Sequence, residues 1–540
     1  MTASNTSRLS LNQTSIIPIL LLIAFIWFCT FMIFRQAPEW DNMEELVWAN
    51  SFELGYQKHP PLPTWILYPL TLIFGRVIWL PTALGLICVA LGQWITYQLY
   101  LRIAKHAKLS NPQEMSLLAI LVSSPLIYFS IRGGDFNHNA VQLWSIAAMY
   151  YFYYRAWESE AVIQSNNKYF GYWGLMGLMM GLAFISKYSV VIQIGVLIAH
   201  FCFVGRWRSG RSWLGVLLAG VVFLGIITPH LVWLYHQTEM GQGPIYYASQ
   251  LMTTQSSLFE RCITMLKDFL LTQVFRLVPC FLVVGVIYFL YKKTISKLGS
   301  SDKPQSWWSQ VQRQDRRFLI WLALGPCVLA MLIGIILDQK IEAKWAVTFF
   351  IVVGFIGWFY ANDLLDVVRL RKIVILGHVI FAVSYGVITG PVASYLGKQG
   401  RSNFPSKALA NVIAQRWQEH PELTKGEPIR LIVGDTWIIG HTIIHDQVSQ
   451  GKNIKPWIDA NDLSSPWMRP EDKRHTALIL IDHAPKPLGQ WWRAGHPPSK
   501  EVQRMFDQAP VKGVEIVPWT MKTDAPPLEI QWAILPYEPS

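Results

Sequence analysis

The chain has 540 residues, of which 52% are hydrophobic, 14% aromatic and only 15% charged. Soluble proteins carry about 25% charged residues, so this composition excludes an ordinary soluble protein and indicates an integral membrane protein with many spans. The net charge of +12 does not indicate nucleic-acid binding, because the basic residues cluster in short loops between apolar runs. The six cysteines form no Cys-x-x-Cys pair, and we interpret them as core residues rather than metal ligands.

Apolar runs long enough to cross a bilayer recur along the first 392 residues. The run near 16–35 follows one arginine without a clear cleavage site, which favours a retained span over a signal peptide. We predict about eleven spans, near 16–35, 78–100, 115–131, 138–157, 170–186, 188–204, 213–235, 267–291, 317–337, 345–361 and 372–392.

The charges of the connecting loops alternate along the chain. The basic loops are expected to be cytoplasmic, because short cytoplasmic loops carry an excess of Lys and Arg. They lie near 102–108, 155–168, 206–211, 292–317 and 369–372. The other loops are then extracytoplasmic, and with an odd number of spans the segment that follows the last span lies on that side too.

That last segment is polar and rich in proline. A helical stretch near 406–418 precedes four short β-like runs, which together predict a small extracytoplasmic α/β domain. The runs lie near 429–433, 477–481, 514–517 and 530–535. We therefore expect a polytopic α-helical membrane domain over 1–394, with a first outer loop at 36–77 that holds interfacial helices, and a soluble α/β domain over 395–540.

The first outer loop opens with Asp41, Glu44 and Glu45. Residues 41–54 have the apolar spacing of a helix that lies in the membrane interface. The pattern Asp41-x-x-Glu44 fits a capping box, in which both acids satisfy backbone groups. The same carboxylates are also candidates for a general base, whose pKa is set by partial burial. Both interpretations stay open at this point.

The same loop continues with Lys58-His59-Pro60-Pro61. The two prolines fix their own φ and bias the preceding residue to an extended conformation. The segment is therefore expected either to project Lys58 or His59 rigidly, or simply to turn the chain back to the membrane.

Three further cationic or acidic positions stand out on the predicted outer side. Asp135 follows Arg132 and two glycines, and is either a functional acid or the N-cap of the span that begins near His138. Lys187 interrupts a long apolar run, and either snorkels to the interface or binds a lipid phosphate. Lys344 shares this side and is a candidate to complete a phosphate cradle.

The first outer loop resembles that of a known enzyme family. Asp41-Asn42-Met43-Glu44-Glu45, Trp48, Gly55-Tyr56, Pro60-Pro61-Leu62 and Trp65 are similar in order to the first outer loop of bacterial family 39 glycosyltransferases. These are the protein-mannosyltransferase and lipid A aminoarabinose-transferase relatives, with the GT-C fold. Shorter patches at 181–188, 229–234 and 340–345 extend the likeness to roughly residues 16–390.

The resemblance implies roles for particular residues. Many relatives have Asp-Glu where this chain has Asp41-Asn42, with its next acids at Glu44 and Glu45. The implied catalytic candidates are Asp41, Asp135 and Glu44. The candidates to bind the donor phosphate are Lys58, His59, Arg132, Lys187 and Lys344. Tyr56, Pro60 and Pro61 belong to the first-loop motif. No metal ligand is expected, and no cofactor is indicated, although Asp135 and His138 leave a divalent metal as a weak alternative.

The implied function is transfer of a hexose or pentose from a polyprenyl-phosphate carrier to an extracytoplasmic acceptor, by displacement with inversion. The expected partners are the lipid-linked donor, membrane lipids and an acceptor that is lipid A, another glycolipid, a glycan or a protein. The expected location is the inner membrane, with the active site and the C-terminal domain facing the periplasm. Two alternatives stay open: a transporter or flippase for a lipid-linked sugar, and a noncatalytic relative.

Overall fold

The structure is a computed structural model, and it describes residues 16–161, 166–241, 243–244, 256–296, 304–338, 341–449, 451–482, 497–521, 524 and 526–537. Lys297 and Lys303 of the predicted basic loop at 292–317 lie outside these residues. The helical part of the described chain contains, in order, α1 (Ile16–Phe34), α2 (Trp40–Trp48), α3 (Leu62–Phe74), α4 (Trp79–His106), α5 (Pro112–Ser123), α6 (His138–Ala161), α7 (Asn166–Phe184), α8 (Val190–Phe203), η2 (Arg206–Arg208), α9 (Gly210–Glu239), α11 (Leu258–Thr264), η3 (Met265–Leu271), α12 (Thr272–Ile295), α13 (Trp307–Gln310), α14 (Arg313–Ile336), η5 (Ala343–Thr348), η6 (Val353–Phe359), α15 (Val367–Val387), η7 (Ile388–Val392) and α16 (Ala393–Tyr395).

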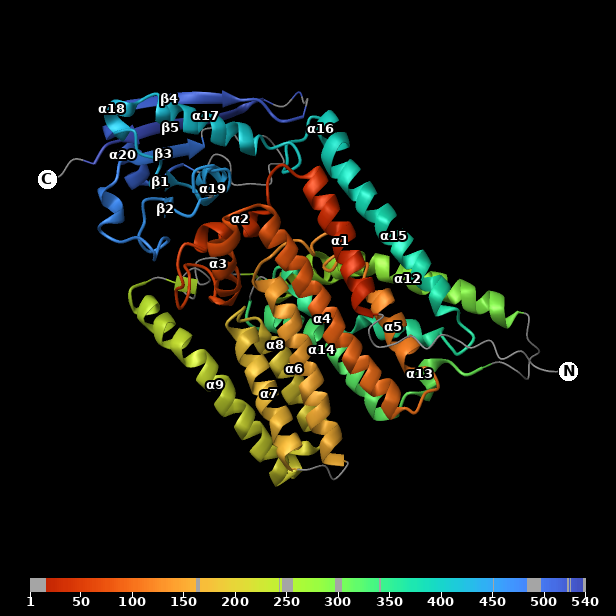
Figure 1. The fold of residues 1–540 in the computed structure, drawn as a ribbon. Helices are drawn as coiled ribbons and strands as arrows, with labels where there is room; N and C mark the ends of the chain where they lie inside the picture. Colours follow the sequence, from red (N-terminus) through yellow and green to blue (C-terminus); the bar gives the residue numbers. More distant parts are fainter. Residues whose placement is uncertain are drawn as a thin grey trace.

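Long apolar helices make up most of this part, and α4, α6, α7 and α9 pack in succession (Figure 1). Among the described residues, six helical segments are long and apolar enough to cross a membrane. They are Ile16–Phe34, Trp79–His106, Gly210–Glu239, Leu258–Thr294, Arg313–Ile336 and Val367–Tyr395. The prediction of a polytopic helical membrane protein is therefore confirmed, whereas the count of about eleven spans stays a prediction.

The predicted span at 345–361 differs in form from the others. It contains two 3-10 helices, η5 and η6, instead of one continuous α-helix. Gly354 lies so close to α5 that an added Cβ would sit 1.9 Å from the carbonyl oxygen of Ala119. This close approach of two backbones explains why glycine occurs within the apolar run.

The first outer loop holds two short helices, α2 and α3. The predicted helix at 41–54 is shorter than expected, because it begins at Trp40 and ends at Trp48. Its N-cap is Glu39, without a side-chain capping bond, so the capping-box interpretation of Asp41 and Glu44 is wrong. Residues 42–48 are all buried, so α2 packs within the protein instead of exposing an apolar face to lipid.

The C-terminal part is a small α/β unit, which we call the sheet domain. Its five strands have the order β2-β1-β3-β5-β4, with β1 parallel to β2 and β3, and β5 antiparallel to β3 and β4. Its elements are α17 (Ser406–Gln418), α18 (Pro421–Thr424), β1 (Leu431–Gly434), α19 (Thr436–Ile444), β2 (Lys455–Ile458), η8 (Asp472–Arg474), β3 (Ala477–Asp482), α20 (Lys500–Gln508), β4 (Val511–Val517) and β5 (Leu528–Leu535). The prediction of a small C-terminal α/β domain is confirmed, although the sequence did not reveal β2.

The sheet domain rests directly on the first outer loop, with α19 beside α2 (Figure 1). Trp40 stacks on Trp437 with 5.4 Å between ring centroids, and Gly440 of α19 lies against Met43 of α2. A side chain at Gly440 would collide with the Met43 sulfur, so this contact also requires glycine. The sheet domain therefore holds α2, and with it the neighbouring acids, in place. The exact boundary at 394/395 stays a prediction.

Candidate active site

A cavity of about 500 Å³ lies between the first outer loop, the loop before α6, the start of α12 and η5. We call it the central cavity. Six of the predicted site residues line it, namely Asp41, Lys58, His59, Arg132, Asp135 and Lys344. The cavity is also lined by Tyr128, Asn137, His138, Asn139, Arg276, Glu342 and Trp345, among others. Of these, His138 was considered from the sequence only as a weak alternative metal ligand, and Tyr128, Asn137 and Asn139 were given no role. Positions from five separate parts of the chain thus meet at one place.

Asp41 lies in the first turn of α2 and is held by the loop before α6. Its Oδ2 accepts a hydrogen bond of 2.6 Å from Nδ2 of Asn137. Asn137 also caps α6, because its Oδ1 accepts bonds from the backbone N–H groups of Asn139 and Ala140. The interpretation of Asp135 as the N-cap of this helix is therefore wrong, because Asn137 caps it instead. The carboxylate of Asp135 is not needed for capping.

Asp135 lies in a network of alternating charges, in which the acids Asp135 and Glu39 are buried and the arginines are partly exposed. Its Oδ2 lies 2.5 Å from Nε of Arg132. Nearby, Glu39 makes ion pairs of 3.0 Å with both Arg35 and Arg401. Burial raises the pKa of Asp135 to about 7, and Glu39 adds to the rise, whereas Arg132 and Arg35 oppose it. Asp135 can therefore exchange a proton near neutral pH, as groups in active sites often do.

Glu39 links this network to the segment between α16 and α17, which leads into the sheet domain, through its ion pair with Arg401. Burial alone would raise the pKa of Glu39, but Arg401, Arg35 and Arg132 hold that pKa below its ordinary value. The backbone oxygen of Arg401 also accepts bonds from the N–H groups of Gln36 and Ala37. The start of the first outer loop is thus tied to the segment after α16.

We predict that Arg401→Gln lowers the free energy of unfolding by about 2 kcal/mol, because the buried Glu39 loses one of its two partly buried ion-pair partners. A carboxylate with a lowered folded-state pKa stabilises the protein above its unfolded value of about 4.3 and loses that effect as the pH falls. The difference in the free energy of unfolding between the variant and the wild type, measured by SDS titration, should therefore be smaller at pH 4 than at pH 7. Lys398→Gln, at an exposed position nearby, is the matched control. An equal loss at both pH values would contradict the assignment.

Asn42 joins α2 to the same loop, and the sequence analysis did not assign it a role in the site. Its side chain is fully buried. Nδ2 donates to the carbonyl oxygen of Gly134 at 3.0 Å, and Oδ1 accepts from the N–H of Phe136 at 2.7 Å. One amide thereby fixes the backbone on both sides of Asp135, one residue along the chain from Asp41.

Glu44 does not line the central cavity. Its Oε1 lies 2.6 Å from Nζ of Lys58, so it orients a lysine that does line the cavity. Glu45 accepts a bond of 2.7 Å from Thr64, and burial raises the pKa of Glu45 to about 8. The two neighbouring acids thus have different environments.

The remaining motif residues shape the loop rather than the cavity. Tyr56 stacks on Trp48 with 5.3 Å between ring centroids, and its hydroxyl donates to the carbonyl oxygen of Ser51. Its backbone N–H bonds the carbonyl of His59. Pro60 and Pro61 are buried. This closed turn presents Lys58 and His59 to the cavity.

The rings of His59 and His138 are in close contact, with 3.6 Å between ring centroids and an angle of 35° between their planes. Burial lowers the pKa of His59 well below its ordinary value, and His138 and Lys187 lower it further. His59 is therefore neutral at physiological pH and offers a hydrogen bond rather than a positive charge.

Lys187 lies directly behind the wall of the cavity, between α7 and α8. Its Nζ donates to Oδ1 of Asn139 at 2.6 Å and lies 5.2 Å from the ring centroid of Trp345. Burial lowers the pKa of Lys187 to about 7, and Lys344 lowers it further. The snorkelling interpretation is wrong, because the side chain points into the protein. Lys187 does not line the cavity, but its positive charge contributes to the electrostatic potential inside it.

Arg276 of α12 completes the cationic side of the cavity. Its guanidinium donates to the hydroxyl of Tyr128 and, at 2.7 Å, to the carbonyl oxygen of Ala343. These two bonds explain how an arginine is accommodated within a long apolar helix. Within the described part of the chain, no group of three or more His, Cys, Asp or Glu side chains is arranged to hold a metal ion.

Comparison with known proteins gives matches in sequence and in fold. Residues 58–233 match the sequence model of the dolichyl-phosphate-mannose-protein mannosyltransferase family. The lipopolysaccharide core galacturonosyltransferase RgtA of Rhizobium johnstonii is 22% identical over 224 residues, which cover 40% of each chain. The chain thus matches less than half of this curated relative's length. The family match includes Lys58, Arg132, Asp135 and Lys187 but begins after Asp41.

The fold agrees with these matches. The structure of apo ArnT from Cupriavidus metallidurans is similar with a TM-score of 0.51 and 11% identity, over 96% of this chain and 97% of that one. The undecaprenyl-phosphate-bound structure of the same protein gives a TM-score of 0.48 and 10% identity, over 96% and 98% of the two chains. The predicted resemblance is confirmed: the chain is a multi-pass membrane protein with the GT-C fold, similar to the family 39 glycosyltransferases.

Proposed function

We propose that this protein transfers a sugar from a polyprenyl-phosphate carrier to an acceptor on the extracytoplasmic side of the inner membrane. One observation carries the proposal: Asp41 and Asp135 share the central cavity with Lys58, Arg132, Arg276 and Lys344. A carboxylate suits proton removal from an acceptor hydroxyl. The cations suit the charge that develops on a leaving phosphate.

The proposed reaction is a direct displacement. The acceptor oxygen attacks the anomeric carbon while Asp41 takes its proton. The bond from that carbon to the phosphate oxygen breaks, and the polyprenyl phosphate leaves with the electron pair toward the cationic side. Attack from the face opposite to the leaving group inverts the anomeric configuration. Glu44 orients Lys58, and Asp135 orients Arg132, so that these two cations face the leaving phosphate.

An apolar groove gives the carrier lipid a place. The groove has a volume of about 390 Å³ and lies between α12 and α15, where Pro279, Leu282 and Phe381 contribute to its walls. Arg276, one helical turn before Pro279 on α12, lines the central cavity. A phosphate held at Arg276 could therefore continue into an isoprenoid chain that lies along the groove.

The experiment that tests the proposal is mass spectrometry of extracted lipids and envelope glycans. A deletion strain should lack one sugar modification, the wild-type gene should restore it, and Asp41→Ala should not. Purified protein in vesicles without an acceptor should not move the lipid-linked sugar across the bilayer. Restoration by Asp41→Ala, or movement without transfer, would contradict the proposal and favour a transporter.

The proposal predicts a pH effect that depends on Lys187. A lysine whose pKa is about 7 is positively charged below that pH and neutral above it. The donor is a phosphodiester with a constant charge, so the KM for the donor should rise by about tenfold between pH 6 and pH 8.5. Lys187→Arg stays charged throughout and should remove the rise. A rise of the same size in the arginine variant, measured with a labelled donor, would contradict this assignment.

A further inference from the structure

The turn between α3 and α4 exposes an apolar surface. Leu72, Ile73 and Phe74 at the end of α3 and Trp79 at the start of α4 are all exposed, Ile73 by 67%. The ring of Phe74 packs edge-on against that of Trp79, with 5.4 Å between ring centroids. We call these four residues the apolar tip. None of them lines the central cavity, so the proposed reaction does not explain their exposure.

The position of α4 places the apolar tip at the surface of the bilayer. α4 is long and apolar enough to cross a membrane, and Trp79 is its first residue. Tryptophan is typical of the level at which a span passes through the lipid headgroups. A short helix with exposed apolar side chains at that level lies in the interface. The end of α3 is therefore inserted into the leaflet on the side of the first outer loop.

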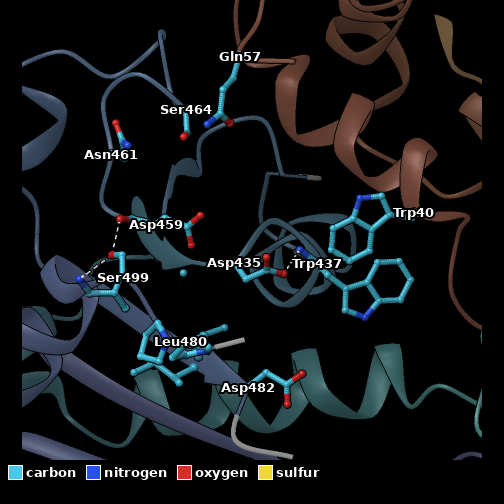
Figure 2. A pocket seen from close by; sticks show the side chains of 15 residues that line it. Trp40, Gln57, Asp435, Trp437, Asp459, Asn461, Ser464, Leu480, Asp482 and Ser499 are labelled. Atoms are coloured by element: carbon cyan, nitrogen blue, oxygen red, sulfur yellow. Dashed lines mark hydrogen bonds between the residues drawn. The ribbon is translucent and has the colours of Figure 1, made fainter. Parts of the chain in front are cut away.

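The sheet domain is attached beside the apolar tip. Arg76, within the turn, is only 3% exposed, and its Nη1 donates to the carbonyl oxygen of Ile454 at 3.4 Å. A second contact, the stack of Trp40 on Trp437, lies at the edge of the cavity that Figure 2 shows. Because Ile454 directly precedes β2 and is bonded to the turn, the start of β2 lies at the level of the lipid headgroups.

A cavity of about 430 Å³ opens beside Ile454, at the start of β1 and β2. We call it the strand-start cavity. Arg430, Lys452 and Lys455 line it, and the backbone N–H of Lys455 donates to the carbonyl oxygen of Arg430 at 2.7 Å. Arg430 lies 3.5 Å from Glu427, and each of these two side chains is half exposed. Neither lysine has an acidic partner among the described residues.

The two acids of the strand-start cavity are engaged by the loops that carry them. Asp446 accepts bonds from two backbone N–H groups of its own loop, at 2.9 and 3.1 Å, and Asp472 accepts one at 2.9 Å. Such bonds are typical of Asp in turns. A smaller adjoining cavity, which shares Arg430, adds Lys425 and Arg474 to the same surface. The surface therefore offers positive charge to a ligand.

We propose that the strand-start cavity binds the phosphate of an anionic phospholipid in the leaflet that holds the apolar tip. Lysine and arginine side chains near a bilayer attract anionic lipids, and they donate charge-assisted hydrogen bonds to a phosphate. Val448 lines the same cavity and is 76% exposed, so it can contact the apolar part of the lipid. The cavity and the apolar tip then hold the sheet domain, and with it α2, at a fixed depth. This inference does not depend on the proposed glycosyl transfer.

The test compares the full-length protein in nanodiscs of phosphatidylcholine alone and of an equal mixture of phosphatidylcholine and phosphatidylglycerol. Hydrogen exchange, followed by mass spectrometry, measures the protection of the backbone at residues 451–458. Exchange there should be about tenfold slower in the mixed nanodiscs, because a lipid bound across the start of β2 suppresses local opening. The double variant Lys452→Gln/Lys455→Gln should exchange at the same rate in both nanodiscs. Its exchange in phosphatidylcholine should match that of the wild type, which shows that it is folded.

Lys512→Gln, at an exposed position on β4 at the opposite edge of the sheet, is the matched control and should keep the effect of phosphatidylglycerol. Equal exchange of the wild type in the two nanodiscs would overturn the proposal, as would an undiminished effect in the double variant. Millimolar inorganic phosphate, added to the protein in detergent, should not slow exchange at these residues. The same protection by free phosphate as by phosphatidylglycerol would show a site for a soluble anion and would overturn the assignment to a lipid.

Discussion

Replacing Asp41 with Asn is expected to lower kcat for sugar transfer by a factor of about 10² to 10⁴, the range that general base catalysis contributes. The amide is nearly isosteric and cannot take the proton of the acceptor. Its oxygen can still accept the bond that Asn137 donates to Asp41 at 2.6 Å. The fold and the KM for the donor should therefore stay close to those of the wild type. The measurement is the rate of transfer from a labelled polyprenyl-phosphate sugar by purified protein in nanodiscs.

Two controls make this result decisive. Asp507→Asn makes the same chemical change at an exposed position and should leave kcat unchanged. An SDS unfolding titration of Asp41→Asn reports whether the variant is folded. Near-normal transfer by a folded Asp41→Asn protein would exclude Asp41 as the base, and Asp135, which shares the cavity, would become the candidate.

Much of the fold could be predicted because the bilayer restricts what a chain can do. Backbone polar groups in lipid must be paired within the segment, so long apolar runs become helices. The exception is η5 and η6, and in η6 Gly354 allows the backbone to approach α5 closely. The strand β2 was not predicted because Lys455-Pro456-Trp457-Ile458 is short and contains proline. Proline is accepted there because β2 is an edge strand.

The site could be predicted only in part, for a physical reason. Charged residues in outer loops are conspicuous one by one, and Asp41, Lys58 and Arg132 were recognised in this way. Their partners are distant in sequence: Asn137 is 96 residues from Asp41, and Asn42 is 94 residues from Phe136. No local pattern signals such pairs. The capping-box interpretation, one of the two left open from the sequence, was wrong for the same reason, since long-range contacts rather than local capping hold Asp41.

Asn42 is the residue whose role the structure changes most, and Asn42→Asp should lower the free energy of unfolding by about 3 kcal/mol at pH 8. An ionised carboxylate can accept from the N–H of Phe136, but it cannot donate to the carbonyl oxygen of Gly134, which lies 3.0 Å from Nδ2. It would also place a buried charge near Asp41 and Asp135.

The pH dependence of the stability of Asn42→Asp shows whether the variant is destabilised by the lost hydrogen-bond donor or by disturbed packing of the core. A protonated carboxyl group can donate and accept as the amide of Asn42 does. Burial should raise the folded-state pKa of the new acid above its unfolded value of about 3.9, so the variant binds the proton more tightly when folded. Its stability relative to the wild type should therefore be nearly restored at pH 4 and should fall as the pH rises.

Asn42→Ala removes both bonds without adding a charge, so its loss of stability relative to the wild type should be the same at pH 4 and pH 8. Asn453→Asp, at an exposed position, should have little effect at either pH. If Asn42→Asp lost as much stability at pH 4 as at pH 8, the two bonds to Gly134 and Phe136 would not be what Asn42 contributes. Asn42 follows Asp41 in the chain and bonds the backbone on both sides of Asp135. If these bonds contributed little, another contact would have to bring Asp41 and Asp135 into one cavity.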